Sequence, residues 1–242
     1  MVRTDDRSGA GAVPIGPVLV ACGHGTRDPG GRRALAQLRL AVADLLPGLE
    51  VVTASVDVQK PALADVVPRL SATGRRCVVV PLLLSAGYHV HVDVAEAVAA
   101  SRGAAVAAAP LGPDPALADV LTDRLAEAAV APDALVVLAA AGSSDSRALA
   151  DVEAVATDLA GRRGSPVVPA YLSAASPGVA EAVADLRARH PSRKVAVATY
   201  LLAPGVFTRR LAAVGADVVT APLAPHPMLA ELVLRRYLEA LP

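Results

Sequence analysis

The sequence predicts an α/β protein of two duplicated domains, each a mainly four-stranded parallel sheet flanked by helices, with a cleft between them. Two observations support this fold. Short apolar runs alternate with segments of helical apolar spacing along the 242 residues, which is typical of parallel strands linked by crossover helices. The alternation also restarts after Pro132-Asp133, and fragments of the first half return in the second.

The first half contains four candidate strands and four candidate helices. Apolar runs, often rich in Val, predict strands over 17–22, 50–56, 76–84 and, more weakly, 104–109. Asp28-Pro29 offers a cap residue and a proline at the first helical position. The helices that follow the four strands are expected over 28–46, 61–71, 92–101 and 116–129.

The second half repeats this order of elements. Strands are expected over 134–140, 166–172, 194–202 and 216–220, and helices over 146–160, 177–189, 208–214 and 227–241. The repeat is also visible in four anchors: Ala109–Pro115 and Ala221–Pro227 (offset 112), Leu83–Gly87 and Leu201–Gly205 (118), Gly25 and Gly142 (117), Pro61 and Pro177 (116). Four anchors at nearly one offset indicate a duplication.

The totals set limits on the class of protein. We expect a flexible tail over 1–16, an N-terminal domain over 17–131 and a C-terminal domain over 132–242. The tail is polar and lacks the apolar segment that a signal peptide contains. No apolar run in the sequence approaches the length needed to span a membrane. With 23 basic and 23 acidic residues, the chain also lacks the basic excess of a nucleic-acid-binding protein.

Two cysteines, Cys22 and Cys77, fall inside expected strands. We interpret them as packed core residues in a reducing compartment, which predicts a cytoplasmic protein. A metal-binding role for Cys22 is the alternative, since it lies two residues before His24.

Three ionisable residues follow strands of the first half: His24, Asp57 and His89. Ligands bind at this carboxyl edge of open α/β sheets. At the offsets of the repeat, the second half has Ala141, Ser173 and Phe207 instead. A purely structural role for the histidines would not predict this difference. The first half is therefore expected to carry the reactive groups, and the second to form the opposite wall.

The three residues leave two kinds of chemistry open. Imidazole and carboxylate can hold a transition-metal ion with open positions, or they can act as acid and base on a metal-free substrate. Backbone N–H groups of loops that open helices bind anions, and Arg27 could pair with a carboxylate. Candidate binding residues in these loops are Gly25, Thr26, Arg27, Ser85, Ala86, Gly87, Tyr88, Ser143 and Ser144.

Two motifs around these residues are similar to a known family. They read ACGHGTRDP at 21–29 and VPLLLSAGYHVHVDV at 80–94, and LGPDPALADVL follows at 111–121. They resemble the sirohydrochlorin chelatases, the class II tetrapyrrole chelatases of the CbiX/SirB type. With the repeat, the resemblance covers almost the full chain and is to the two-domain bacterial form. Asp57 stands where the family often has Glu.

The resemblance implies insertion of a divalent metal into sirohydrochlorin, with no organic cofactor. His24 and His89 would bind the metal and accept protons, and Asp57 would assist. Fe²⁺, giving sirohaem, is the expected metal, and Co²⁺ on the route to cobalamin is the near alternative. A third possibility is a protein that carries the tetrapyrrole or the metal without catalysing insertion. The expected partners are the macrocycle and the metal, with no nucleic acid and no membrane, and the protein is either a monomer or a homodimer.

Overall fold

A computed structural model describes residues 16–85 and 88–241, without the side chains of 88–92. It contains two four-stranded parallel sheets. The first has β1 (Val18–Gly23), β2 (Val51–Ser55), β3 (Cys77–Pro81) and β4 (Ala105–Ala107) in the order β2-β1-β3-β4. The second has β5 (Leu135–Ala140), β6 (Val167–Tyr171), β7 (Val195–Tyr200) and β8 (Val218–Val219) in the order β6-β5-β7-β8. The expected fold class is confirmed.

Helices follow the strands as the apolar spacing predicts. They are α1 (Pro29–Leu45), α2 (Leu63–Ala72), α3 (Tyr88–Ala100), α4 (Pro115–Glu127), α5 (Ser146–Arg163), α6 (Val179–Arg189), α7 (Val206–Leu211) and α8 (Pro227–Glu239). Local chemistry sets several ends. The Asp28 side chain accepts from the N–H groups of Gly30 and Gly31, and Asp145 accepts from that of Arg147. Both are N-caps, which satisfy N–H groups that the first turn leaves unpaired.

Strand register confirms the duplication residue by residue. Leu19 on β1 pairs with Val51 and Val78, whereas Val136 on β5 pairs with Val167 and Ala196. These pairs of positions differ by 117, 116 and 118 residues. Those are the offsets at which Gly25, Pro61 and Leu83–Gly87 recur in the sequence. The two halves therefore have the same strand pairing, and loop-length changes account for the small differences in offset.

Each sheet buries both faces, so its strands are continuous apolar runs. Alternate residues of one strand enter different cores. Val18, Val20 and Cys22 pack in a core with α2 and α3, and Val137 and Ala139 pack in one with α6 and α7. The opposite faces share a third core, which extends through both halves and contains residues of α1, α4, α5 and α8. This shared core fixes one sheet relative to the other.

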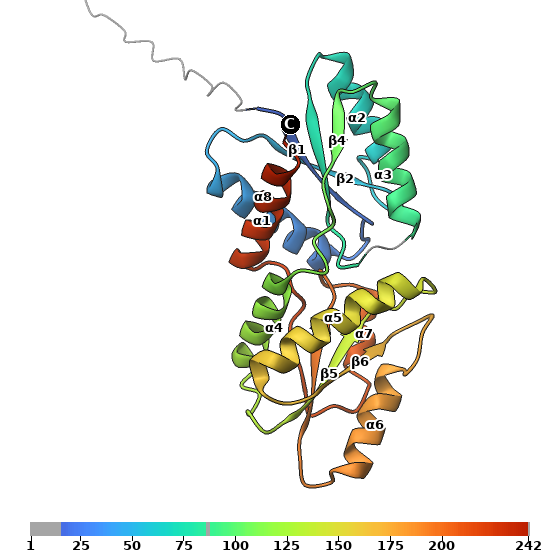
Figure 1. Ribbon diagram of the computed structural model, residues 1–242, viewed down its shortest axis with the longest axis vertical. Coiled ribbons are helices and arrows are strands. Elements are labelled where there is room, and N and C mark those ends of the chain that lie inside the picture. The colour runs from blue at the N-terminus through green and yellow to red at the C-terminus, as the bar shows by residue number, and fades with distance from the viewer. Residues whose placement is uncertain (1–15, 86–87, 242) are drawn as a thin grey trace, which may run out of the picture.

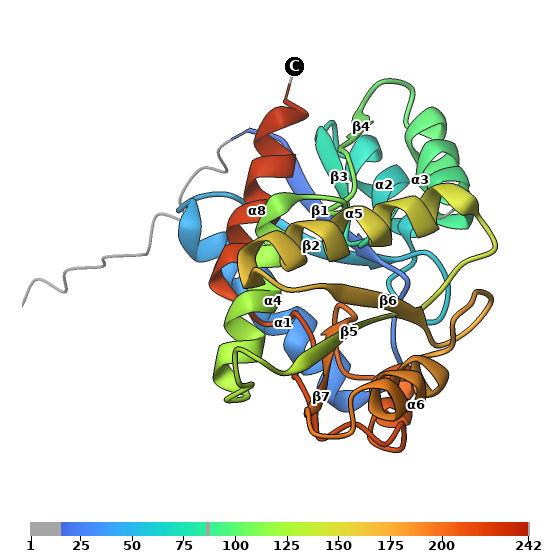
Figure 2. The ribbon, with the colours of Figure 1, turned by 60° about the horizontal axis from the view of Figure 1, so that its bottom comes forward.

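The last helix of each half packs on the other half. Helix α4 contacts α5 and β7 of the second sheet, and α8 contacts α1 and β3 of the first. Figure 1 shows red α8 beside blue α1, and green α4 beside yellow α5; the view of Figure 2 shows α8 again on the side of the first sheet. The sequence repeat begins again near Pro132-Asp133. In the fold, however, the last helix of the first repeat packs on the second sheet, and the last helix of the second repeat packs on the first sheet.

Arginines of the exchanged helices tie the two halves together in matching ways. Arg124 on α4 donates to the carbonyl oxygens of Leu223 (2.9 Å) and Pro225 (2.5 Å). Its counterpart Arg236 on α8 donates to those of Pro110 (2.8 Å) and Leu111 (3.4 Å). Each helix thus satisfies carbonyl groups of the loop that precedes the other. The two crossings therefore make equivalent contacts at positions that match in the sequence repeat.

Some boundaries differ from the sequence prediction. Strand β3 ends at Pro81, and Leu82–Ser85 continue as a loop in which Leu82 still donates to the Cys22 carbonyl (2.7 Å). Helix α3 begins at Tyr88, not at 92, so His89 lies in its first turn rather than in a loop. Asp93 lies inside this helix. The expected tail, 1–16, lies outside the described residues except for Gly16.

None of the helices within 16–85 and 88–241 is both long and apolar enough to cross a bilayer.

Candidate functional site

A cavity of about 700 Å³ lies where the carboxyl ends of the two sheets meet. The first half contributes His24 and the loop Leu82–Ser85. The second half contributes the ends of β5, β6 and β7 and the start of α5. The cleft expected from the sequence is therefore present, and both halves form its walls. Its volume falls in the usual range for sites that bind small organic molecules.

His24 follows β1 directly, is exposed and lines this cavity. The loop after β2 runs beside it: Val56 donates to the Gly23 carbonyl (3.1 Å) and Val58 to that of His24 (3.4 Å). Asp57 lies between these two donors, so its backbone is held next to His24. Its side chain is exposed and does not line the cavity.

Gly25, Thr26 and Arg27 form the turn from β1 to α1. Gly25 has φ +91°, and a Cβ there would lie 2.9–3.1 Å from atoms of Val58 and Gln59. Thr26 receives a hydrogen bond from Asp28 N–H through its hydroxyl and donates its own N–H to Gln59. Arg27 is exposed. These residues do not line the large cavity; Gly25 lines a smaller one of about 150 Å³ beside α1.

The structure describes only part of the second motif, which covers residues 80–94. Ser85 lines the large cavity. Ala86 and Gly87 lie outside the described residues. Tyr88 and His89 start α3, and their side chains are among those not described. The predicted convergence of His89 with His24 therefore stays a prediction.

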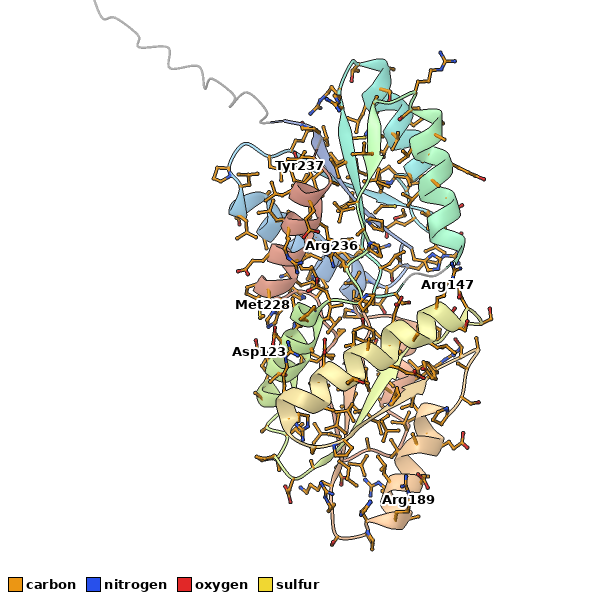
Figure 3. The ribbon with its side chains drawn as sticks, in the orientation of Figure 1. Asp123, Arg147, Arg189, Met228, Arg236 and Tyr237 are labelled. Carbon is orange, nitrogen blue, oxygen red and sulfur yellow. The ribbon has the colours of Figure 1, made fainter. Side chains whose placement is uncertain are left out.

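Ser143 and Ser144, two of the candidate binding residues, line the cavity from the second half. The next residues, Asp145 and Arg147, also line it and form an ion pair of 2.8 Å at the start of α5. Hydrogen bonds from the Arg147 side chain and its N–H lower the pKa of Asp145. Arg147 projects at the level between the two sheets in Figure 3, and its side chain is largely exposed. The sequence analysis did not single out either residue.

Three aromatic residues of the second half, Tyr171, Tyr200 and Phe207, also line the cavity. Tyr171 and Tyr200 end β6 and β7 and are almost fully buried. The Tyr200 hydroxyl donates to the Leu84 carbonyl (2.7 Å), which joins the second sheet to the loop after β3. Their position at the ends of strands was the signal that could have identified them. Phe207 was expected only as part of a wall.

At the other side of the site, the start of α1 packs on the loop before α7. A Cβ on Gly31 would lie 2.4 Å from the Pro204 carbonyl oxygen, so the helix and the loop approach closely. Arg209 of α7 forms an ion pair with the cap residue Asp28. The Gly31 N–H and the Arg209 guanidinium hold the pKa of Asp28 below its ordinary value. These contacts connect the two halves next to His24.

The surroundings of Cys22 do not suit a metal ligand. It is fully buried among Val18, Val20 and α2, and burial, with the charge of Asp93, raises the pKa of its thiol to about 12. Metal ligation needs the thiolate. Across the described side chains, no three His, Cys, Asp or Glu residues form a group that could hold a metal. The packed-core interpretation therefore fits Cys22.

Comparison with known proteins gives the family. A model of the CbiX family matches residues 18–128 and again residues 135–240. SirB from Bacillus subtilis with Fe³⁺ is 21% identical, with a TM-score of 0.80 over 93% of this chain and 96% of that one. The sirohydrochlorin chelatase SirB from Bacillus subtilis subspecies spizizenii in complex with cobalt is 20% identical, with a TM-score of 0.74 over 93% and 95%.

A third structure is DR2241 from Deinococcus radiodurans, a multi-domain protein described as similar to chelatases. It is 22% identical, with a TM-score of 0.67 over 94% of this chain and 55% of that one. At these identities the three likenesses show the fold. A search of curated protein sequences found no match. Because the family model covers most of the sequence in two successive copies, the chain belongs to the CbiX family.

Proposed function

We propose that this protein is a sirohydrochlorin chelatase, which inserts a divalent metal ion into the macrocycle. The observation that carries the proposal is the cavity between the halves, with the His24 imidazole on its wall and no equivalent histidine at Ala141. Membership of the CbiX family supports it, as does the shared fold with a protein described as a sirohydrochlorin chelatase.

The reaction would need a weak metal site and proton acceptors. Insertion replaces two pyrrole N–H protons with one divalent ion, so two protons must leave for bases or water. A neutral imidazole can coordinate iron or cobalt through one nitrogen, and it can accept a proton when it is free. We assign both roles to His24 and His89. Asp57, whose backbone is hydrogen-bonded beside His24, would accept protons or orient the incoming ion.

A metal site with few protein ligands favours transfer of the ion over its storage. A tight site with four protein ligands would hold the metal against the macrocycle, whereas an open site can pass it on. The metal is then a substrate, and the reaction needs no organic cofactor.

The binding loops would hold the carboxylates of the macrocycle. Ser85, Ser143 and Ser144 line the cavity and offer hydroxyl or backbone donors. Gly25, Thr26 and Arg27 lie at the turn beside His24 and would bind carboxylates outside the cavity. Ala86, Gly87 and Tyr88 of the second motif complete the proposed binding set.

Iron is our preferred metal, giving sirohaem, and cobalt is the alternative. Both accept imidazole and carboxylate ligands, and their affinities for one site follow a common order.

We also propose a cytoplasmic protein, because Cys22 and Cys77 are free thiols, as expected in a reducing compartment. A monomer already contains both walls of the cavity, and the exchange of helices does not require a second chain.

The test is anaerobic metallation of sirohydrochlorin with Fe(II), Co(II) and Ni(II), followed by absorbance. We expect the wild-type protein to accelerate insertion over the enzyme-free rate, and His24→Ala to lose at least about tenfold, the usual scale for a general base or metal ligand. His190→Ala is a matched control, since His190 caps the far end of α6. Binding without acceleration would favour a carrier, and acceleration unchanged in His24→Ala would reject the assigned roles.

A further inference from the structure

The cavity collects most of the aromatic side chains of the protein. The sequence has one Phe, four Tyr and no Trp. Three of these five line the cavity, namely Tyr171, Tyr200 and Phe207, and all three come from the second half. Tyr237 is elsewhere, on α8, where its hydroxyl donates to the Pro17 carbonyl. Most other core residues in this protein are Ala, Val and Leu. Concentration of rings at one cavity therefore indicates a ligand that benefits from them.

Phe207 is the aromatic residue best placed to touch a ligand. Tyr171 and Tyr200 are almost fully buried, whereas Phe207 keeps part of its surface exposed in the first turn of α7. Its ring packs on the second-half core, so its position is fixed. In the sequence repeat it occupies the place of His89. The second half thus has an aromatic ring at the position where the first half has the imidazole of His89.

A cation accompanies this ring. The Arg210 guanidinium lies 5.3 Å from the centre of the Phe207 ring, within the range of a cation–π contact. Neighbouring arginines are already paired with carboxylates, Arg209 with Asp28 and Arg147 with Asp145. Arg210 has no ion-pair partner in the described part of the chain, and its side chain is exposed. It therefore presents an unneutralised positive charge beside the ring.

We infer that Phe207 and Arg210 form the surface on which the second half holds the macrocycle. This inference rests on the proposed function. Phe207 would contact the flat conjugated ring system by offset stacking or edge-to-face contact, the favourable arrangements for aromatic pairs. Arg210 would pair with a carboxylate at the edge of the macrocycle, and the cation–π contact would keep its guanidinium in place. The two residues bind substrate; the proton and metal steps belong to the first half.

The test is an absorbance titration with metal-free sirohydrochlorin, which separates binding from metal insertion. We expect Phe207→Ala to raise Kd about tenfold and Phe207→Leu, which keeps apolar packing but removes the aromatic face, about threefold. Arg210→Gln should raise Kd about threefold at low salt and less at 0.5 M NaCl, because salt screens exposed charges. Loss of initial insertion rate should follow Kd and disappear at saturating macrocycle.

Two controls match these variants. Val206→Ala alters the exposed residue next to Phe207, and Arg189→Gln removes an arginine at the far end of α6 (Figure 3); both should bind as wild type does. Thermal melts exclude unfolding as the cause of weaker binding. If wild type binds the macrocycle, and Phe207→Leu and Phe207→Ala both bind it with the Kd of wild type, the inference is wrong and the proposed function stands. If wild type itself fails to bind the macrocycle, the proposed function is wrong as well.

Discussion

Single residues with unusual backbone angles shape both walls of the site. Gly25 and Gly142 occupy matching positions after β1 and β5, and their φ values are +91° and +93°. This left-handed region is strained for residues with a Cβ. A Cβ on Gly142 would also lie 1.8 Å from the Ser173 carbonyl oxygen. The two turns thus need glycine for conformation and for space.

Gly142→Ala should therefore be far more damaging than a substitution that changes φ alone. Gly164 is the matched control: it ends α5 at φ +64°, with no atom within 4 Å of an added Cβ. Gly164→Ala should cost about 1 kcal/mol of the free energy of unfolding, and Gly142→Ala more than about 3 kcal/mol. Urea denaturation followed by circular dichroism measures both. Equal losses would mean that the loop after β6 moves away freely.

Several residues that the sequence marked as candidates lie at the cavity, while their roles stay predictions. His24, Ser85, Ser143 and Ser144 were expected at the site and line the cavity. Tyr171 and Tyr200 were not singled out, although each ends a strand, because a tyrosine at the end of an apolar strand also fits an ordinary core. Their contact with the cavity depends on how the two halves pack together through the shared core, which no local pattern in the sequence specifies.

At the level of elements, the junction of α4 and α8 contains an ion cluster with unequal halves. Asp114 caps α4, is only 7% exposed, and receives hydrogen bonds from Arg235 (2.8 Å) and Arg236 (2.7 Å) on α8. At the matching junction, His226 lies 3.4 Å from Asp123. Figure 3 labels Asp123 on α4 and Arg236 on α8. The duplication kept the crossing and the matching arginines Arg124 and Arg236, but it has His226 in the place of Asp114 and Asp123 in the place of Arg235.

This cluster predicts a pH dependence of stability. Burial alone would raise the pKa of Asp114, but hydrogen bonds from Arg235 and the Ala116 N–H, with the charges of both arginines, outweigh it and lower the pKa. A carboxyl group with a lowered pKa stabilises the fold above its ordinary pKa of about 3.9 and loses that contribution as pH falls through the folded value.

Asp114→Asn should remove this contribution. We expect the variant to be less stable at pH 7 by about 3 kcal/mol, the lower end for breaking a buried ion pair, and to lose less stability than wild type between pH 4 and pH 2. Chemical denaturation at each pH measures it. Asp185→Asn, which breaks an exposed pair on α6, is the control and should change little at pH 7. Parallel pH profiles for Asp114→Asn and wild type would contradict the assignment.

The order of elements was predictable from the sequence, and their partners were not. Alternation of apolar runs and helical spacing predicted the strands and helices in order, with ends shifted by a few residues. Helix α3 began earlier than expected because Tyr88, His89 and Val90 show no apolar spacing that would mark a first turn. The exchange of α4 and α8 was missed for a different reason: a repeat shows where a unit recurs along the chain, not which sheet its last helix covers.

For the whole molecule, the exchange means that neither half is complete alone. A fragment ending at residue 131 would keep α4 without its surface on α5 and β7, and would lack the α8 that covers α1 and β3. We expect this fragment to fail to form a stable monomer: it should bind a hydrophobic dye or dimerise by exchanging α4. Gel filtration with light scattering and a dye assay would show this.

Adding the fragment of residues 132–242 should restore a one-to-one complex with the secondary structure of the intact chain. The intact protein with a cleavable site inserted at 131 provides the control for the effect of the cut itself. A monomeric first fragment that unfolds cooperatively would show that the exchanged helix is dispensable for the first half.

Helix α8 is also synthesised after the other helices that the structure describes, and it covers the sheet that is made before the second one. Roughly 120 residues separate the end of β4 from α8, which a ribosome adds in about 6–24 s at 5–20 residues per second. During that interval the α1 side of the first sheet remains partly uncovered. The nascent first half is therefore expected to be a substrate for chaperones on the ribosome until helix α8 emerges and docks.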